Sequence, residues 1–382
     1  MPETRDRELR MLDQAAAEFA AKELAPNREE NDKFPFGPFC WDVVEKAHEL
    51  DFFHFMLPDS LNGLNQGMSA LCRLLENLCR EDSSLGAIVF TNTAAQEILL
   101  GAGAEQALAG ITEGKAAAEV LLGLPVFVNP AEVEHLPFAR KTGDGYVLSG
   151  PLEYMVLGGV ARHALIPGRM EGIDGFSWFL VDLSRSRVRK SEPVLSLGLR
   201  ACPAVDLDLG EAEARLIGRE GGGEACFNRM ADRFHIAAAA MSAGVMKGAF
   251  KEALEYARGR FQGGRKIIQW SEVKMMLADM AVQIENADMI LASACQAVDA
   301  GRSGWERKSR AAALHIQKTA CEAATDGVQV MGGVGYMKDY GQEKRMRDAR
   351  QLQSLLGLAP LKRIRFIEKM IKSEKKEKSH SP

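Results

Sequence analysis

The sequence predicts an α+β protein in which a β domain separates two helical domains. Three observations predict this order: a helical apolar period over residues 1–115, short β-branched and aromatic runs between turn signals over 116–225, and a return to the helical period afterwards. The chain has 382 residues, enough for two or three domains with a sizeable core. We expect an N-terminal helical domain, a middle β-barrel or sandwich domain, a C-terminal four-helix bundle and a disordered tail, which cover residues 1–115, 116–225, 226–372 and 373–382.

The N-terminal segment has the spacing of amphipathic helices. Apolar residues recur at steps of three and four until Ala25-Pro26, where proline favours the end of the first helix. Three further helices are expected over residues 38–50, 68–78 and 85–110. The apolar faces of the first and third helices consist of Leu9, Leu12, Ala16 and Phe19, and of Met68, Leu71, Leu75 and Leu78.

The middle segment changes to the period of β-strands. Val205, Leu207 and Leu209 alternate with Asp206 and Asp208, a pattern typical of a half-buried strand. This alternation, together with the turn signals around it, predicts a small β domain.

The clearest helix of the C-terminal segment lies between residues 273 and 298. Its apolar residues form an unbroken four-three repeat, which predicts the seam of a bundle: Val273, Leu277, Met280, Ile284, Ala287, Leu291, Ala294 and Val298. Leu361, Ile364 and Ile371 mark a last helix, and four helices of this kind predict an antiparallel bundle. The residues that follow Lys372 include too few apolar groups to dock, so we expect disorder there.

Composition argues against several classes of function. The net charge of −4 gives no reason to expect nucleic acid as a partner, and no apolar run is long enough to span a bilayer. The first residues lack the apolar core of a signal peptide, so we expect a cytoplasmic protein. The seven cysteines are scattered without metal-ligand spacing, which predicts core residues in a reducing compartment and no metal site.

A glycine-rich stretch, Gln329-Val-Met-Gly-Gly-Val-Gly-Tyr336, separates two helical segments. Two interpretations are open. Exposed backbone N–H groups there, with Arg345, Arg347 and Arg350 close behind, suit an anion such as a pyrophosphate. Alternatively, the stretch is an ordinary interhelical turn and the arginines form a solvated face.

This stretch resembles the C-terminal signature of the acyl-CoA dehydrogenase family, Q-(I/V)-x-G-G-x-G-Y followed by R-D-A-(K/R), here Arg347-Asp-Ala-Arg350. The resemblance extends from about residue 7 to about residue 370. It implies FAD as the cofactor, an acyl-CoA substrate and a tetramer of homologous subunits. It also implies an electron-transferring flavoprotein as the common electron acceptor.

The resemblance further implies a glutamate that removes the α proton of the thioester while FAD takes a hydride from Cβ. Counting on from Arg350 places Leu356 at this position, and the position used by some relatives falls at about Phe234. Neither side chain accepts a proton, so we predict an atypical member that lacks the catalytic glutamate. Glu153 and Asp232 remain candidates for a recruited base.

The segments that would contact the flavin in this chain's own β domain are altered. Where the family has T-E-P and then A-G-S-D, residues 123–131 read Gly-Leu-Pro-Val-Phe-Val-Asn-Pro-Ala. Val156 stands where the family has the hydroxyl residue of W-I-(T/S). Tyr154, at the tryptophan position, is the one candidate for stacking on the ring.

The flavin-contacting motifs of the bundle match the family pattern more closely than those of the β domain do. Arg260 lies in a stretch that resembles A-R-x-R-x-Q-F-G, and Gln329, Gly332 and Gly333 match the signature. In family members these groups reach across a subunit interface and hold the ADP half of the neighbour's FAD. We therefore predict Arg260, Gln329, Gly332, Gly333 and Tyr154 as cofactor-binding residues.

Three functions are open at this point. The first is an FAD-linked protein that acts on an acyl-CoA thioester with Leu356 at the usual base position. The second is a non-catalytic partner subunit that completes the FAD site of a homologous active chain in a mixed tetramer. The third is a fold relic that binds CoA esters or nothing.

Overall fold

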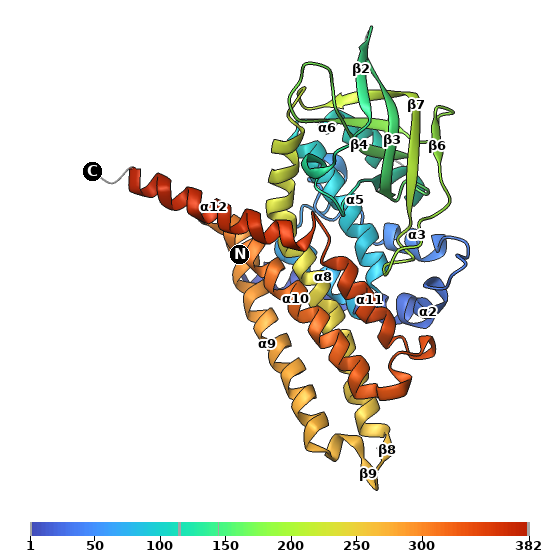
Figure 1. The fold of residues 1–382 in the computed structure, drawn as a ribbon, viewed down its shortest axis with the longest axis vertical. Coiled ribbons are helices and arrows are strands. Elements are labelled where there is room, and N and C mark those ends of the chain that lie inside the picture. The colour runs from blue at the N-terminus through green and yellow to red at the C-terminus, as the bar shows by residue number, and fades with distance from the viewer. Residues whose placement is uncertain (1, 114–115, 144, 380–382) are drawn as a thin grey trace.

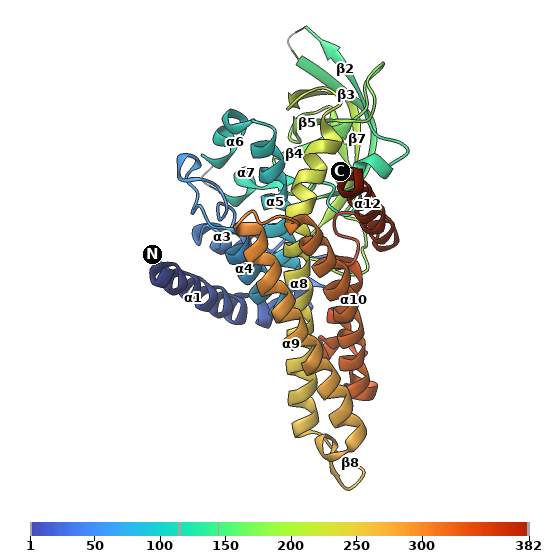
Figure 2. The ribbon, with the colours of Figure 1, turned by 90° about the vertical axis from the view of Figure 1, so that its left-hand side faces the viewer.

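The computed structural model describes residues 2–113, 116–143 and 145–379. A β-sheet lies at one end of the molecule, and long helices run from it to the opposite tip (Figure 1). The N-terminal helices pack on one side of these long helices, next to the sheet (Figure 2). The predicted α+β class and the order helical, β, helical are confirmed.

The N-terminal domain is built around two buried helices. Leu71, Leu75 and Leu78 of the predicted apolar face are fully buried. The Asp82 carboxylate accepts a hydrogen bond from Ser84 N at 2.8 Å and caps the helix that follows. The helices are α1 (Pro2–Phe19), α2 (Arg28–Asn31), α3 (Trp41–Glu49), α4 (Met68–Glu81), α5 (Ser83–Gly101), α6 (Glu105–Thr112) and α7 (Ala117–Val120), with a π-helical turn at Ala20–Leu24 and short 3₁₀ turns at Ala25–Asn27 and Asp59–Leu61.

The middle domain contains a seven-stranded sheet in which the strand order is β1-β4-β5-β7-β3-β2, with β6 also paired to β7. The pairs are antiparallel except β1 with β4. Val205, Leu207 and Leu209 point into a core of their own, whereas Asp206 and Asp208 are exposed, as the alternation predicts. The strands are β1 (Leu122–Gly123), β2 (Phe138–Thr142), β3 (Gly145–Val156), β4 (His163–Gly168), β5 (Ser177–Asp182), β6 (Val188–Lys190) and β7 (Ala204–Ile217), with a 3₁₀ turn at Pro130–Glu132.

The C-terminal bundle consists of α8 (Gly223–Gly259), α9 (Ser271–Asp299), α10 (Trp305–Met331) and α11 (Gln342–Leu352). A short hairpin of β8 (Phe261–Gln262) and β9 (Arg265–Lys266) forms its tip, and 3₁₀ turns lie at Ile267–Gln269, Gly332–Val334 and Lys338–Tyr340. Helix α4 packs tightly on α8, because a Cβ atom at Gly244 would come within 2.3 Å of Glu76 O. The four-three repeat of α9 faces inward, and each of its members is buried or half-buried.

The last helix, α12 (Ala359–Ser379), differs from the prediction. It leaves the bundle and projects from it (Figure 1), so α11 takes the fourth place beside α8 and α10. Ile364 and Ile371 are therefore about half exposed. Residues 373–379, predicted to be disordered, continue α12, since lysine and glutamate are good helix formers. Residues 380–382 lie outside the described part of the chain.

Within the described residues, no helix is long and apolar enough to cross a membrane.

Candidate functional site

Leu356, at the family's base position, lies in the loop between α11 and α12. Its side chain is 2% exposed and its backbone is left-handed, with φ of 62°. Its N–H donates a hydrogen bond to Val126 O at 2.7 Å, which fixes the loop against the β domain. The position therefore presents an apolar side chain and a backbone donor that already has an acceptor.

Tyr154 lies on β3, at the boundary between the β domain and α11. Gln351 Nε2 donates to its hydroxyl at 2.6 Å, so the side chain joins the sheet to α11. Phe127 packs against its ring edge-on at a centroid distance of 5.6 Å. Burial raises the pKa of the Tyr154 hydroxyl, although hydrogen bonds from Ser196 and Gln351 oppose the effect.

The other positions considered for a base do not provide one. Phe234 is fully buried and packs edge-on against Phe90 at 5.6 Å. Asp232 forms a close ion pair with Arg310. Glu153 is exposed on β3.

A small cavity beside Leu356 contains polar groups that sequence reasoning did not identify: Asn129, His235, Arg310 and Lys362. Lys362 Nζ donates to three oxygens, Gln353 O at 2.8 Å, Leu355 O at 2.9 Å and Gln317 Oε1 at 3.1 Å. Burial lowers the pKa of Lys362 to about 7.

His235 and Asn129 also line this cavity. Burial, followed by the positive charges of Lys362, Arg310 and Lys369, lowers the pKa of His235 well below its usual value. Asn129 Nδ2 is buried without a hydrogen-bond partner among the described residues. No local sequence pattern signals either residue, because their neighbours come from distant segments.

The remaining predicted cofactor residues lie elsewhere. Arg260 follows α8, while Gln329, Gly332 and Gly333 lie at the end of α10, and both helices end away from the sheet (Figure 1). One chain therefore does not bring these four residues together with Tyr154. All four are exposed, and no ion pair among the described residues includes Arg260.

The glycines leave the surface at this end open. A Cβ atom at Gly332 would meet nothing within 4 Å, and one at Gly333 would meet only Tyr336 Oη at 3.9 Å. Gly332 also has a positive φ of 62°, which a side chain would strain. Gly335 is different, because a Cβ atom there would lie 2.3 Å from Val328 O. Gly332 and Gly333 thus keep space free outside the protein.

Two of the arginines behind the glycines are not available to an anion, nor do they form a solvated face. Arg345 is 3% exposed and donates to Glu252 Oε1 at 2.9 Å and to Arg80 O at 2.5 Å. Arg347 pairs with Glu343 at 2.6 Å and with Asp32. The sequence-based expectation for these two side chains is wrong, because Glu252 and Asp32, which pair with them, are far away along the chain. Arg350 is exposed.

No group of three or more histidine, cysteine, aspartate or glutamate side chains within the described ranges is arranged to hold a metal ion.

The chain consists of a helical domain, a β domain and a helical bundle, and the loop that carries Leu356 lies between the β domain and the bundle. This arrangement defines a protein of the acyl-CoA dehydrogenase type. Residues 6–111 match the acyl-CoA dehydrogenase N-terminal domain and residues 222–364 match the C-terminal domain. The chain belongs to the acyl-CoA dehydrogenase family.

Relatives cover nearly the whole chain. Cyclohex-1-ene-1-carbonyl-CoA dehydrogenase of Geobacter metallireducens is 28% identical over 357 residues, 90% of this chain and 93% of that protein. The short-chain acyl-CoA dehydrogenase of Clostridium acetobutylicum is 27% identical over 94% of this chain and 97% of its own length.

Solved structures share the fold. A chain in the structure of the electron transferring flavoprotein of Acidaminococcus fermentans has a TM-score of 0.86 at 26% identity, and the alignment covers 95% of this chain and 97% of that one. Butyryl-CoA dehydrogenase of Megasphaera elsdenii also has a TM-score of 0.86, at 20% identity, over 95% of this chain and 98% of that chain.

Members of the family are FAD flavoproteins, so the residues at the family's flavin positions in this chain can be tested for their fit to a flavin ring. Leu124 and Val156 stand where the family has polar residues, and each is 1% exposed. Leu124 N donates a hydrogen bond to Val156 O at 3.2 Å. The Tyr154 hydroxyl and the Leu356 N–H already have partners. The residues at these positions of this chain do not fit an isoalloxazine ring.

Proposed function

We propose that this chain is a non-catalytic partner subunit of an FAD-dependent assembly of the acyl-CoA dehydrogenase type. In this assembly its bundle end completes the flavin site of a homologous active chain, within a mixed tetramer. The buried Leu356 and its engaged N–H carry the proposal, since they remove both the base and a free backbone donor from this chain's own site.

The bundle end supports the lending role. Arg260 is exposed and free of ion pairs with the described residues, and the two glycines leave room beside Gln329 for a ligand to approach the backbone. An arginine in this state suits the phosphates of an ADP group, because its planar guanidinium donates two parallel hydrogen bonds.

Exposed apolar side chains support an assembly. Met275, Val282 and Met289 repeat every seven residues on α9 and are each more than half exposed. Such a stripe on a bundle helix is typical of a surface that packs on another helix.

A second function is favoured by the cavity beside Leu356: an FAD-linked enzyme that acts on an acyl-CoA thioester with an unusual base. The unpartnered Asn129 Nδ2 and the buried Lys362 supply polar groups there. This function requires Tyr154 and the Leu356 loop to move away from their present hydrogen bonds.

The ultraviolet-visible spectrum of the purified protein distinguishes the two functions. We expect a colourless protein when it is purified alone, and a flavin spectrum when it is co-purified with a homologous chain that retains the glutamate. In that complex, Arg260→Ala should lower the flavin content, whereas Arg258→Ala, which removes an exposed arginine two residues earlier, should not.

A yellow protein purified alone, whose flavin bleaches with acyl-CoA thioesters under anaerobic conditions, would overturn the partner role and support the second function. Equal flavin content in the Arg260→Ala and Arg258→Ala complexes would remove Arg260 from the lent site.

A further inference from the structure

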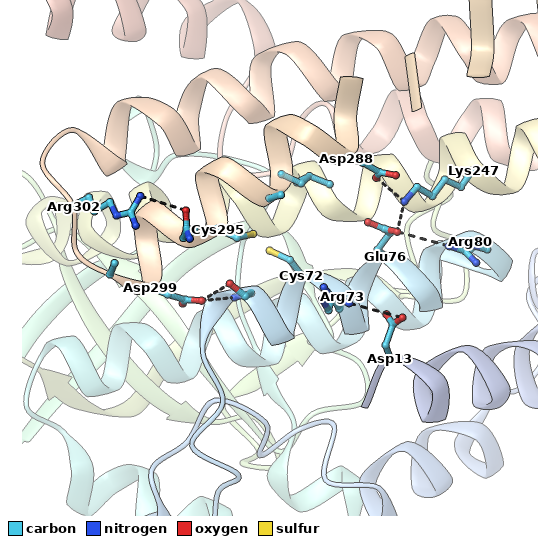
Figure 3. A pocket seen from close by; sticks show the side chains of 15 residues that line it. Asp13, Cys72, Arg73, Glu76, Arg80, Lys247, Asp288, Cys295, Asp299 and Arg302 are labelled. Carbon is cyan, nitrogen blue, oxygen red and sulfur yellow. Dashed lines mark hydrogen bonds and ion pairs between the residues drawn. The ribbon is translucent and has the colours of Figure 1, made fainter. Parts of the chain in front are cut away.

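A cavity of about 930 Å³ lies between α4, α8 and α9, away from Leu356 and Tyr154 (Figure 3). Four acidic and four basic residues line it: Asp13, Glu76, Asp288, Asp299, Arg73, Arg80, Lys247 and Arg302. Most of these charges are already paired with one another, as the dashed lines of Figure 3 show. Most of these charged groups therefore already have a partner and are not free to bind a charged ligand.

Two thiols remain on the walls of this cavity. Cys72 belongs to α4 of the N-terminal domain and Cys295 belongs to α9 of the bundle. Their sulfur atoms point toward each other in Figure 3, across the space between the two helices. The residues are 4% and 7% exposed, so both lie just beneath the cavity surface.

Hydrogen bonds and ion pairs on both sides of the two thiols hold α4 and α9 together. On one side, the Asp299 carboxylate of α9 accepts hydrogen bonds from Met68 N at 2.8 Å and Ser69 N at 3.1 Å, the first residues of α4. On the other side, Lys247 Nζ bridges Glu76 of α4 and Asp288 of α9, at 2.6 Å from each. A disulfide forms only where two cysteines are close and correctly oriented, and these contacts keep α4 and α9 together on either side of the two thiols.

We propose that Cys72 and Cys295 form a redox-active dithiol that a peroxide oxidises to a disulfide linking α4 to α9. The site is separate from the proposed flavin site and does not depend on that function.

The reaction balances with hydrogen peroxide as the two-electron oxidant. Cys295, the more exposed thiol, loses its proton and attacks one peroxide oxygen, which gives a sulfenic acid and, with that proton, one water. The Cys72 sulfur then attacks the sulfenic sulfur, forms the S–S bond and releases hydroxide, which takes the Cys72 proton as a second water. Two thiols and one peroxide thus become one disulfide and two waters.

The environment sets the order and speed of these steps. The hydrogen bond with Cys295 and burial raise the pKa of Cys72 well above its usual value. Cys72 is therefore a poor first nucleophile, which leaves the first step to Cys295, and its raised pKa also slows its attack on the sulfenic acid. We expect oxidation to be slow compared with that of a thiolate peroxidase.

The test treats the full-length protein with graded hydrogen peroxide and reads intact mass and thiol-blocked peptide maps. We expect a loss of 2 Da, from the two hydrogens removed, and a cross-linked peptide pair containing Cys72 and Cys295, both reversed by dithiothreitol. The thermal unfolding midpoint should rise by several degrees on oxidation, since the bond closes a long loop.

Cys72→Ser should stop the reaction at the sulfenic acid of Cys295, which dimedone captures. Cys202→Ser is the matched control, because Cys202 is equally buried and lies near another thiol, that of Cys40. It should oxidise as the wild type does. If Cys72→Ser fails to fold, Cys72→Ala takes its place. The peptide map of the wild-type protein tests for the disulfide between Cys72 and Cys295 even without either variant.

Free Cys72 and Cys295 in the peptide map, under peroxide that oxidises other cysteines of the chain, would overturn the proposal. So would a disulfide between any other pair in their place.

Discussion

Lys344 holds the three domains together through buried charges, and replacing it with methionine tests how much they contribute. Its Nζ donates to Asp82 Oδ1 at 2.9 Å and to Asp348 Oδ2 at 2.7 Å, and all three side chains are at most 4% exposed. Asp82 caps α5 of the N-terminal domain. Asp348, on α11, also accepts Leu199 N of the β domain at 2.7 Å.

Removing the ammonium leaves two carboxylates buried without a counter-ion. Breaking a buried pair in this way costs about 3–5 kcal/mol, so we expect Lys344→Met to lower the free energy of unfolding by about that amount at pH 7. Urea unfolding followed by circular dichroism measures it.

The control is Lys318→Met. Lys318 pairs with Glu322 at 3.5 Å on the surface, where the two side chains are 60% and 47% exposed. An exposed pair contributes only about 0–1 kcal/mol, so this variant should be close to the wild type. A loss below about 1 kcal/mol for Lys344→Met, equal to that of the control, would refute the reasoning.

The same variant predicts a change in acid stability. Burial alone would raise the pKa of Asp82. The Lys344 charge and the hydrogen bonds from Ser84 N and Lys344 lower the pKa by more than burial raises it, so the pKa of Asp82 lies below the ordinary 3.8. In the wild type this contribution is fully present above pH 3.8 and is lost as pH falls through the folded pKa. In Lys344→Met the ammonium no longer opposes the effect of burial on the pKa of Asp82, so that pKa should be higher. As pH falls, the free energy of unfolding of this variant should therefore begin to decline at a higher pH than that of the wild type.

Three further predictions concern other sites. Asp299→Ala removes the side-chain cap of α4 and should cost about 1–2 kcal/mol in urea unfolding, and an unchanged midpoint would contradict the capping role. Burial lowers the pKa of Lys362 to about 7 from 10.5, so between these values the unfolded chain binds more protons and wild-type stability should rise with pH. Lys362→Met should flatten that rise when unfolding is measured at both ends of the window, and equal slopes would show that Lys362 is not its source. Leu356→Glu alone should produce no efficient acyl-CoA dehydrogenation, because the residues at this chain's own flavin positions do not fit the flavin ring, and robust turnover would count against that view.

Local periodicity explains what the sequence predicts well. The repeat from Val273 to Val298 and the alternation from Val205 to Leu209 each lie within one element, so the neighbours that bury them need not be known. Helix α12 shows the limit of this reasoning. Its apolar residues have a helical period, yet Ile364 stays exposed, because periodicity gives the face of a helix and not the surface that covers it.

Long-range pairing explains what could not be predicted at the site. Arg347 looked available to an anion, but its partner Asp32 lies at the other end of the chain. Lys362 gave no signal at all, since its three oxygen acceptors meet only when α10 and the loop before α12 pack together. The absence of a base at Leu356 was visible from the motif, whereas the engagement of its N–H was not.

The length of α8 mechanically couples the two ends of the molecule. This helix has 37 residues, which correspond to about 55 Å at 1.5 Å per residue. One end is wedged under the sheet, where a Cβ atom at Gly223 would lie 2.4 Å from the Phe176 ring, and the other leads directly to Arg260. A rotation of about 5° at the sheet would swing the far end by about 5 Å, more than the length of a hydrogen bond. The contact of Gly223 with the β domain and the position of Arg260 thus belong to one continuous helix that joins the two ends of the molecule.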